Sequence, residues 1–190
     1  MSFSMYLPTR SLFGCGMLNH LHEQHMPGKR ALLVISEGGS VKTNGILERT
    51  LKELRMTGTE TVVFDRVHAN PLRSDITDGS LAARENQCDF VLALGGGSAM
   101  DAGKMIAVMA VNEGDLWDYV SGGTGGDFPV HHDPLPVVCI ATTSGTCSGL
   151  NAWSSITNEE TGEKIMCGGL DSLFPVFSIT DPELMLSVPP

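Results

Sequence analysis

Short runs of apolar residues alternate with helix-like segments along most of this chain. Five runs have the length of buried strands: residues 31–35 (ALLVI), 61–64 (TVVF), 90–94 (FVLAL), 137–141 (VVCIA) and 176–179 (VFSI). They are almost continuously apolar rather than alternating, which is typical of a parallel sheet covered on both faces. We therefore expect a parallel sheet with helices packed against it.

Three segments between these runs have helical patterns. Residues 43–56 place their apolar positions on one stripe, residues 76–87 form a second helix, and residues 98–111 are apolar around most of the circumference, which predicts a buried helix. The alternation predicts right-handed crossovers in a Rossmann-like α/β domain with helices on both faces of the sheet. Residues 121–134 are rich in Gly and Pro and are predicted to be loop.

Composition excludes several classes of function. The 190 residues, 42% of them hydrophobic and 18% charged, suffice for one sizeable core. The net charge of −10 argues against binding to nucleic acids or anionic membranes, and no apolar run is long enough to span a membrane. The five cysteines are odd in number and show no CxxC spacing, which favours core-facing thiols and a cytoplasmic location.

The segment from residue 89 to 107 carries the clearest chemistry. A predicted strand ends in Gly95-Gly96-Gly97, and Ser98 opens a helix. Glycines let backbone amides approach a phosphate closely, and a helix N-terminus adds free N–H donors with a partial positive charge. Because ligands of α/β folds bind at the carboxyl ends of strands, this turn predicts a pyrophosphate site.

Two alternatives remain open at this turn. Ser98 and Asp101 also have the spacing of a capping box, in which each side chain bonds to the other residue's amide without any ligand. Both functions are compatible, since a capped turn is also preorganised. Lys104, one turn farther along, is either a solvated surface charge or a partner of the phosphate.

Several segments together resemble the amino-terminal half of the iron-containing (group III) alcohol dehydrogenases. They are residues 8–16 (PTRSLFGCG), Asn70-Pro71, 95–104 (GGGSAMDAGK), 142–148 (TTSGTCS) and 181–190 (DPELMLSVPP), in the family's order and spacing. Residues 38–45 (GGSVKTNG) and 151–164 look like the branch of butanol dehydrogenases and NADPH-dependent aldehyde reductases. The resemblance implies the amino-terminal fold shared with dehydroquinate synthase.

The resemblance implies a cofactor-binding role for each matching position. These are Asn70, Gly96, Gly97, Ser98, Asp101, Thr142, Thr143, Thr146, Ser148 and Lys164. The glycines and Ser98 would hold the pyrophosphate, with Asp101 beside them. The first two threonines would contact the adenosine-to-diphosphate part, Thr146 and Ser148 would line the next part of the cleft, and Asn70 and Lys164 would lie near the riboses.

The choice of cofactor depends on the residues after the first long strand. NAD-preferring relatives place a carboxylate there, whereas this chain has Gly38, Gly39 and Ser40, with Lys42 close by. Small residues, a hydroxyl and a cation suit a 2′-phosphate, so the sequence favours NADP(H) over NAD(H). That preference requires the neighbouring Glu37 to turn away from the site.

The chain departs from the family pattern directly after Thr146. It has Cys147-Ser148-Gly149 where the family usually has a small residue followed by Ser-Glu, so any role of that glutamate is in doubt. No histidine is placed by the sequence to activate Cys147. We therefore predict that Cys147 is a buried structural thiol rather than a nucleophile.

The metal-binding part of the family is not expected within these residues. Residues 1–180 would form the dinucleotide-binding domain, and 181–190 would begin the connection to a helical domain that binds Fe²⁺ or Zn²⁺. The chain alone is then expected to bind cofactor weakly and to turn over no alcohol or aldehyde. The resemblance also implies an edge strand at residues 11–13 that can pair in a homodimer.

Two other classes of function remain open. Glycerol-dehydrogenase-like and dehydroquinate-synthase-like enzymes share the GGGS-x-x-D turn. An isolated, non-catalytic binding module is the second alternative. The TTSGT segment and the DPELMLSVPP ending favour the alcohol dehydrogenases.

Overall fold

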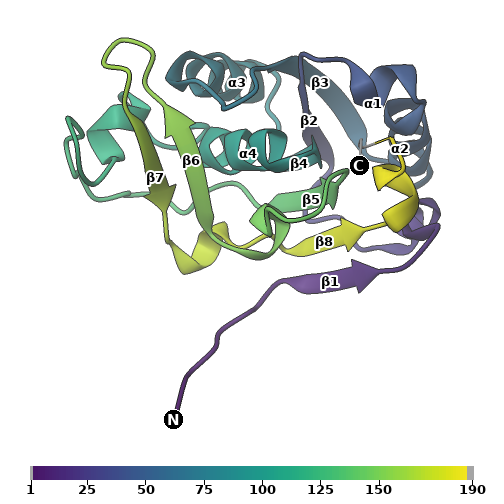
Figure 1. Cartoon of the computed structure of the whole chain (residues 1–190). Coiled ribbons are helices and arrows are strands. Elements are labelled where there is room, and N and C mark those ends of the chain that lie inside the picture. The colour runs from purple at the N-terminus through teal and green to yellow at the C-terminus, as the bar shows by residue number, and fades with distance from the viewer. Residues whose placement is uncertain (1, 188–190) are drawn as a thin grey trace.

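A six-stranded, all-parallel sheet forms the centre of the computed structural model, which describes residues 2–187 (Figure 1). Its order is β1-β8-β5-β4-β2-β3. The strands are β1 (Arg10–Phe13), β2 (Arg30–Ser36), β3 (Glu60–Val67), β4 (Phe90–Gly95), β5 (Val137–Ala141) and β8 (Phe177–Thr180). Every residue of β4 and β5 is buried, as their continuous apolar runs predict. The predicted Rossmann-like α/β fold is confirmed.

Helices cover both faces of this sheet. They are α1 (Ser40–Thr43), α2 (Ile46–Met56), α3 (Arg73–Glu85) and α4 (Gly97–Met109), with short 3₁₀ helices η1 (Met17–Glu23), η2 (Leu116–Tyr119), η3 (Ser148–Leu150), η4 (Asp171–Leu173) and η5 (Pro182–Met185). One core cluster joins the sheet to α3 and α4, and a second joins the opposite face to α2 and η1. The two clusters confirm the doubly wound arrangement.

The helix predicted over residues 43–56 is interrupted. Gly45 has a left-handed backbone (φ 75°), so the chain turns there and α2 starts only at Ile46. The preceding residues form the separate short helix α1. A left-handed conformation suits glycine because it has no Cβ.

A two-stranded antiparallel hairpin, β6 (Trp153–Thr157) with β7 (Lys164–Gly168), was not predicted from the apolar runs. It packs across α4, on the side of that helix away from the sheet (Figure 1). Ile156 and Cys167 are buried in the same core cluster as α4. This cover explains why α4, predicted to be buried, is enclosed on nearly every side.

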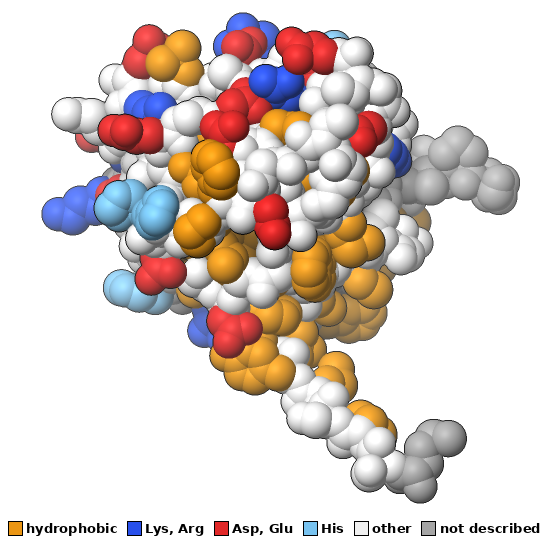
Figure 2. Space-filling view, turned by 90° about the vertical axis from the view of Figure 1, so that its left-hand side faces the viewer, with side chains coloured by type: hydrophobic (Ala, Val, Ile, Leu, Met, Phe, Trp, Pro, Cys, Tyr) orange, Lys and Arg blue, Asp and Glu red, His pale blue; other side chains and the backbone are white. Residues whose placement is uncertain are grey.

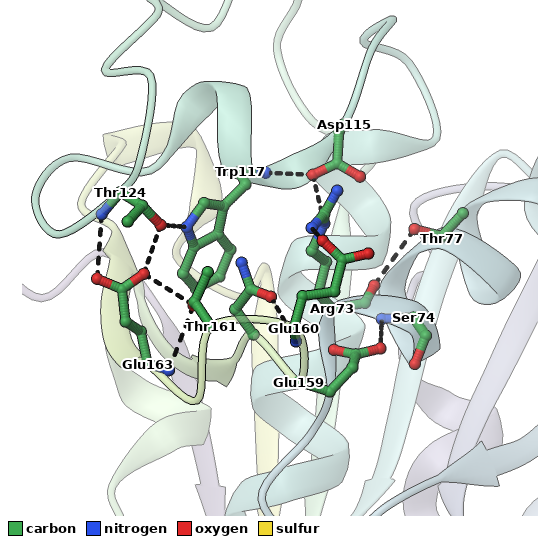
Figure 3. Close-up of polar contacts among 11 residues, drawn as sticks. Arg73, Ser74, Thr77, Asp115, Trp117, Thr124, Glu159, Glu160, Thr161 and Glu163 are labelled. Carbon is green, nitrogen blue, oxygen red and sulfur yellow. Dashed lines mark hydrogen bonds and ion pairs between the residues drawn. The ribbon is translucent and has the colours of Figure 1, made fainter.

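Polar contacts tie the turn of this hairpin to α3 and to the segment around η2 (Figure 3). Arg73, at the start of α3, donates to Asp115 (2.7 Å) and to Glu160 (2.9 Å). Glu163 accepts a hydrogen bond from the Thr124 amide (3.1 Å). The network therefore ties the predicted loop over residues 121–134, through Thr124, to Glu163, the residue just before β7.

The edge strand β1 pairs only with β8 in the described residues, so the predicted edge position is confirmed. Phe13 at its end is 73% exposed. The residues before β1 extend away from the body, and Figure 2 shows hydrophobic side chains along this segment and at its base. Tyr6 contacts Phe174 edge to face, with ring centroids 5.8 Å apart. Pairing through this edge in a homodimer stays a prediction.

No helix within residues 2–187 combines the length and the apolar character that crossing a bilayer requires.

Candidate functional site

A cleft made of three adjoining hollows lies at the carboxyl ends of β2, β4 and β5. The Gly38 hollow is lined by Ser36, Glu37, Gly38, Ala69, Gly96, Gly97, Ser98 and Thr143. The Asn70 hollow shares Gly97 and Ser98 with it and continues to Asp101, Thr146, Ser148 and Lys164. The Cys147 hollow shares Thr146 and Ser148 and ends at Phe13, Pro182 and Met185.

Most of the predicted site residues line this cleft. Those that do are Gly38, Asn70, Gly96, Gly97, Ser98, Asp101, Thr143, Thr146, Ser148 and Lys164. Gly39, Ser40 and Thr142 are not among the lining residues and lie beside it in the chain, where the Thr142 amide donates to the Gly95 carbonyl (2.9 Å). The fold thus brings residues from Gly38 to Lys164 together around one cleft.

The glycine turn leaves the start of α4 open. Gly96 is the N-cap residue and provides no side-chain cap, so the first helix amides lack the partner that Ser, Thr or Asp would supply. A Cβ at Gly97 would lie 2.9 Å from Thr146 Cγ2, and one at Gly96 would lie 3.1 Å from Thr143 Oγ1. The close packing of this turn against Thr143 and Thr146 therefore favours glycine at both positions.

The alternative capping box at Ser98 and Asp101 is wrong. The Ser98 hydroxyl accepts a hydrogen bond from the Asn70 amide (3.2 Å). Asp101 accepts from the Ser148 hydroxyl and from the Ser155 amide (3.0 Å). Both side chains link α4 to other segments, because the loop after β3 and the hairpin come close enough to compete for them.

Lys104 fits neither of its two predicted roles. Its side chain is fully buried, and its Nζ donates to the Ser148 carbonyl (3.0 Å), to Asn151 Oδ1 (3.2 Å) and to the Trp153 carbonyl. Burial lowers the pKa of its ammonium, while nearby Asp101 opposes that shift. Lys104 thus holds the segment that carries Ser148, at the border of two hollows.

Asn70 and Lys164, both predicted only through the resemblance, contact each other. The Lys164 ammonium donates to Asn70 Oδ1 (2.7 Å). Asn70 has a left-handed backbone (φ 58°), a conformation that asparagine tolerates better than most residues. Together they put a cation and an amide on one wall of the Asn70 hollow.

Lys42, the cation predicted beside Gly38, pairs with Asp65. Lys42 Nζ lies 2.5 Å from Asp65 Oδ2, and this contact lowers the pKa of Asp65. Glu37 does line the Gly38 hollow, with its carboxylate 3.6 Å from His68 Nε2. Sequence reasoning missed His68, although its position directly after β3 and two residues before Asn70 was an available signal.

Cys147 is exposed, so its predicted burial is wrong. It lies in the turn after β5 with a left-handed backbone (φ 52°) and lines the hollow named after it. Cys147 lies outside the core because β5 ends at Ala141 and the chain leaves the sheet there.

No group of three or more His, Cys, Asp or Glu within residues 2–187 is arranged to hold a metal ion. His22 and His25, three residues apart, do not form a pair of metal ligands. The ring of His22 bonds to Glu53 (2.6 Å), which raises the pKa of that histidine, and no such contact joins it to His25.

The chain is similar to several known dehydrogenases. The chain is 36% identical over its full length to 1,3-propanediol dehydrogenase of Klebsiella pneumoniae, covering 49% of that protein. It is 35% identical to NADH-dependent butanol dehydrogenase A of Clostridium acetobutylicum, again over its full length and 47% of the relative. The crystal structure of the Thermotoga maritima NADH-dependent butanol dehydrogenase A superposes with a TM-score of 0.89 at 32% identity, covering 99% of this chain and 46% of that one.

The chain therefore spans about half the length of the curated relatives that it matches. The sequence model of one family, described as "Iron-containing alcohol dehydrogenase", matches residues 8–182. This match covers nearly all of the chain, including the glycine turn at the start of α4. The chain belongs to the iron-containing alcohol dehydrogenase family.

Proposed function

We propose that this chain is the amino-terminal, cofactor-binding part of an oxidoreductase that moves a hydride between NAD(P)H and an alcohol/aldehyde pair. The observation that carries the proposal is the open N-terminus of α4, set behind Gly96 and Gly97 at the end of β4. Free helix amides beside glycine favour a pyrophosphate. The relatives described as butanol and propanediol dehydrogenases support the substrate class.

Different residues of the cleft bind different parts of the cofactor. The amides of Gly97 and Ser98 bind the phosphates, Asn70 and Lys164 bind ribose hydroxyls, and the Gly38 hollow takes the adenosine. The nicotinamide end extends toward the Cys147 hollow. The bound cofactor supplies the hydride, and these residues orient it.

The proposed enzyme also needs a metal that the rest of the protein provides. A bound Fe²⁺ or Zn²⁺ stabilises a developing alkoxide, and residues 2–187 offer no such site. We assign residues 1–180 to the dinucleotide-binding domain and 181–190 to the connection that follows. Asp181 anchors its start by accepting hydrogen bonds from the amides of Gly16 (3.0 Å) and Leu18 (3.1 Å); residues 188–190 lie outside the described structure.

We further propose that NADP(H) binds more tightly than NAD(H). Glu37 lines the Gly38 hollow instead of turning away from it, but the His68 ring lies 3.6 Å from its carboxylate and can offset its charge. Nothing lies within 4 Å of the place where a Gly38 side chain would begin, so that part of the cleft is open to a 2′-phosphate. Four relatives are described as NADH-dependent butanol dehydrogenases, two of them as probable, so a preference for NADP(H) would distinguish this chain from them.

Replacing Gly38 with aspartate tests this preference directly. The open space accepts the new side chain, and its charge repels a 2′-phosphate while it can accept a hydrogen bond from a 2′-hydroxyl. We expect NADPH affinity to fall about tenfold or more, equivalent to about 1.4 kcal/mol, with NADH affinity kept or improved. Fluorescence titrations with each nucleotide measure both dissociation constants.

Gly38→Asn is the matched control, because it has nearly the same shape without the charge. We expect it to weaken NADPH far less than Gly38→Asp does. Equal losses for both variants, or equal effects on NADPH and NADH, would contradict a 2′-phosphate position beside Gly38. Failure of the unmodified chain to bind either nucleotide would contradict the proposed function itself.

Lys164→Gln provides an independent test on the other wall of the cleft. Loss of the ammonium removes the hydrogen bond that Lys164 donates to Asn70 Oδ1, together with the positive charge on this wall of the cleft. Since hydrogen bonds to charged groups contribute about 1.5–3 kcal/mol and this one is exposed to solvent, we expect about a fivefold to tenfold loss of affinity for both nucleotides. Lys29→Gln, at the opposite ends of the strands, should leave both affinities unchanged; comparable losses in both variants would mean a general electrostatic effect.

We also propose a cytoplasmic location. All five cysteines are free, and three of them, Cys88, Cys139 and Cys167, are buried. Burial raises the pKa of the Cys139 and Cys167 thiols to about 12, so both stay in the unreactive thiol form. Such a set suits a reducing compartment.

A further inference from the structure

His68 stands at the border of the Gly38 hollow, in the loop between β3 and α3. Its neighbour Ala69 lines that hollow, as does Glu37, whose amide donates to the Val67 carbonyl (2.9 Å). The His68 ring thus lies beside the place where the adenosine end of the cofactor is proposed to bind.

Two carboxylates fix the orientation of the His68 ring. Asp75 of α3, itself only 4% exposed, lies 2.7 Å from Nδ1 and also accepts the His68 amide (3.0 Å). Glu37 Oε2 lies 3.6 Å from Nε2. One ring nitrogen is therefore held inside the protein, and the other faces the glutamate of the hollow.

The charges around His68 come from three elements. Asp75 on α3, Glu37 after β2 and Glu159 in the β6–β7 turn are all acidic, and the hydrogen bond with Asp75 does most to raise the pKa of His68. Lys42, the lysine that the sequence places close to Gly38, is paired with Asp65 instead. His68, rather than Lys42, is therefore the basic side chain beside Glu37.

We propose that His68 and Glu37 together determine which dinucleotide this cleft prefers. Protonated His68 donates from Nε2 to the 2′-phosphate of NADP(H), whereas Glu37 accepts a hydrogen bond from the 2′-hydroxyl of NAD(H). The 3.6 Å separation leaves the pair loosely engaged, so a ligand group can replace either partner. This inference rests on the proposed dinucleotide-binding function.

The preference then changes with pH in a fixed direction. Because the folded protein raises the pKa of His68, the ring is charged below that pKa and loses its proton as the pH rises through it. The loss leaves Glu37 without a compensating charge, which repels a 2′-phosphate and not a 2′-hydroxyl. The preference for NADPH over NADH should therefore be greatest at low pH.

Titrations of the whole chain with NADPH and NADH, from about pH 6 to about pH 9, test this inference. We expect the ratio of the NADH to the NADPH dissociation constant to fall about tenfold across this range. In His68→Gln the ratio should be low throughout, with only the residual slope from titration of the 2′-phosphate itself. Glu37→Gln should strengthen NADPH binding and weaken NADH binding.

His20→Gln is the control, because His20 pairs with the exposed Glu23 in η1 and does not line the cleft. It should keep the pH dependence of the unmodified chain. If both nucleotides bind but His68→Gln has the same ratio and slope as the unmodified chain, the inference is wrong and the proposed function stands. If neither nucleotide binds to the unmodified chain, both are overturned.

Discussion

Replacing Gly97 with valine is expected to abolish most of the affinity of this chain for NADPH and NADH alike. The first carbon of the new side chain would lie 2.9 Å from Thr146 Cγ2, so the rest of it must enter the cleft where the Gly38 and Asn70 hollows meet. Phosphates could then no longer reach the amides of α4. Losing two charge-assisted hydrogen bonds of about 1.5 kcal/mol each corresponds to a loss of about 100-fold or more.

Two further variants show whether a side chain at position 97 weakens binding by covering the α4 amides or by a clash with Thr146. Gly97→Ala adds only the Cβ, and Thr146→Ser removes the methyl group that this Cβ would meet. We expect the double variant to recover the thermal stability lost by Gly97→Ala and still to bind nucleotide poorly. Full recovery of binding by the double variant would show that Gly97 serves packing against Thr146 rather than access to the phosphates.

Replacing Lys104 with methionine is expected to cause the largest loss of stability. Methionine has a similar volume, yet it leaves the buried carbonyls of Ser148 and Trp153 without their donor. Removing the ammonium also removes a desolvation cost, which offsets part of the loss. Since a buried unsatisfied polar group costs about 1–3 kcal/mol, we expect a net decrease of about 3 kcal/mol in the free energy of unfolding and about 6–12 °C in Tm.

Lys52→Met, on the exposed side of α2, is the matched control. It should change stability by no more than about 0.5 kcal/mol. Lys104→Met should also weaken NADPH binding at temperatures where it is fully folded, because its segment carries Ser148. A Lys104→Met protein as stable as the unmodified chain would mean that the carbonyls find other donors, and the proposed role of Lys104 would be wrong.

Much of the sheet could be predicted from sequence, because strands buried on both faces must be continuously apolar. The runs in β4 and β5 are of this kind, and every residue in them is buried. The β6–β7 hairpin was missed because it alternates: Ser154 and Ile156 are buried while Trp153 is half exposed, and its partner strand is mostly exposed. Such short mixed segments lack a hydrophobic run.

The sequence predicts site residues that belong to a local motif. It does not predict those whose surroundings come from distant parts of the chain. The glycine turn is a local feature, and its open helix end follows from Gly96 and Gly97. The prediction for Lys104 was wrong because its burial depends on the β6–β7 hairpin, which is formed by the distant residues 153–168. His68 was missed because its proposed role depends on contacts with Glu37 and Asp75, which come from different segments of the chain.

The central claim is that a dinucleotide binds at the start of α4, and amide chemical shifts of the ¹⁵N-labelled chain test it most directly. On addition of NADPH, we predict the largest shifts at Gly96, Gly97 and Ser98, with smaller ones at Thr143 and Gly38. Gly97→Val should abolish them. Saturation with NADPH that leaves the amides of this turn unmoved, or that shifts only residues outside the cleft, would contradict the claim.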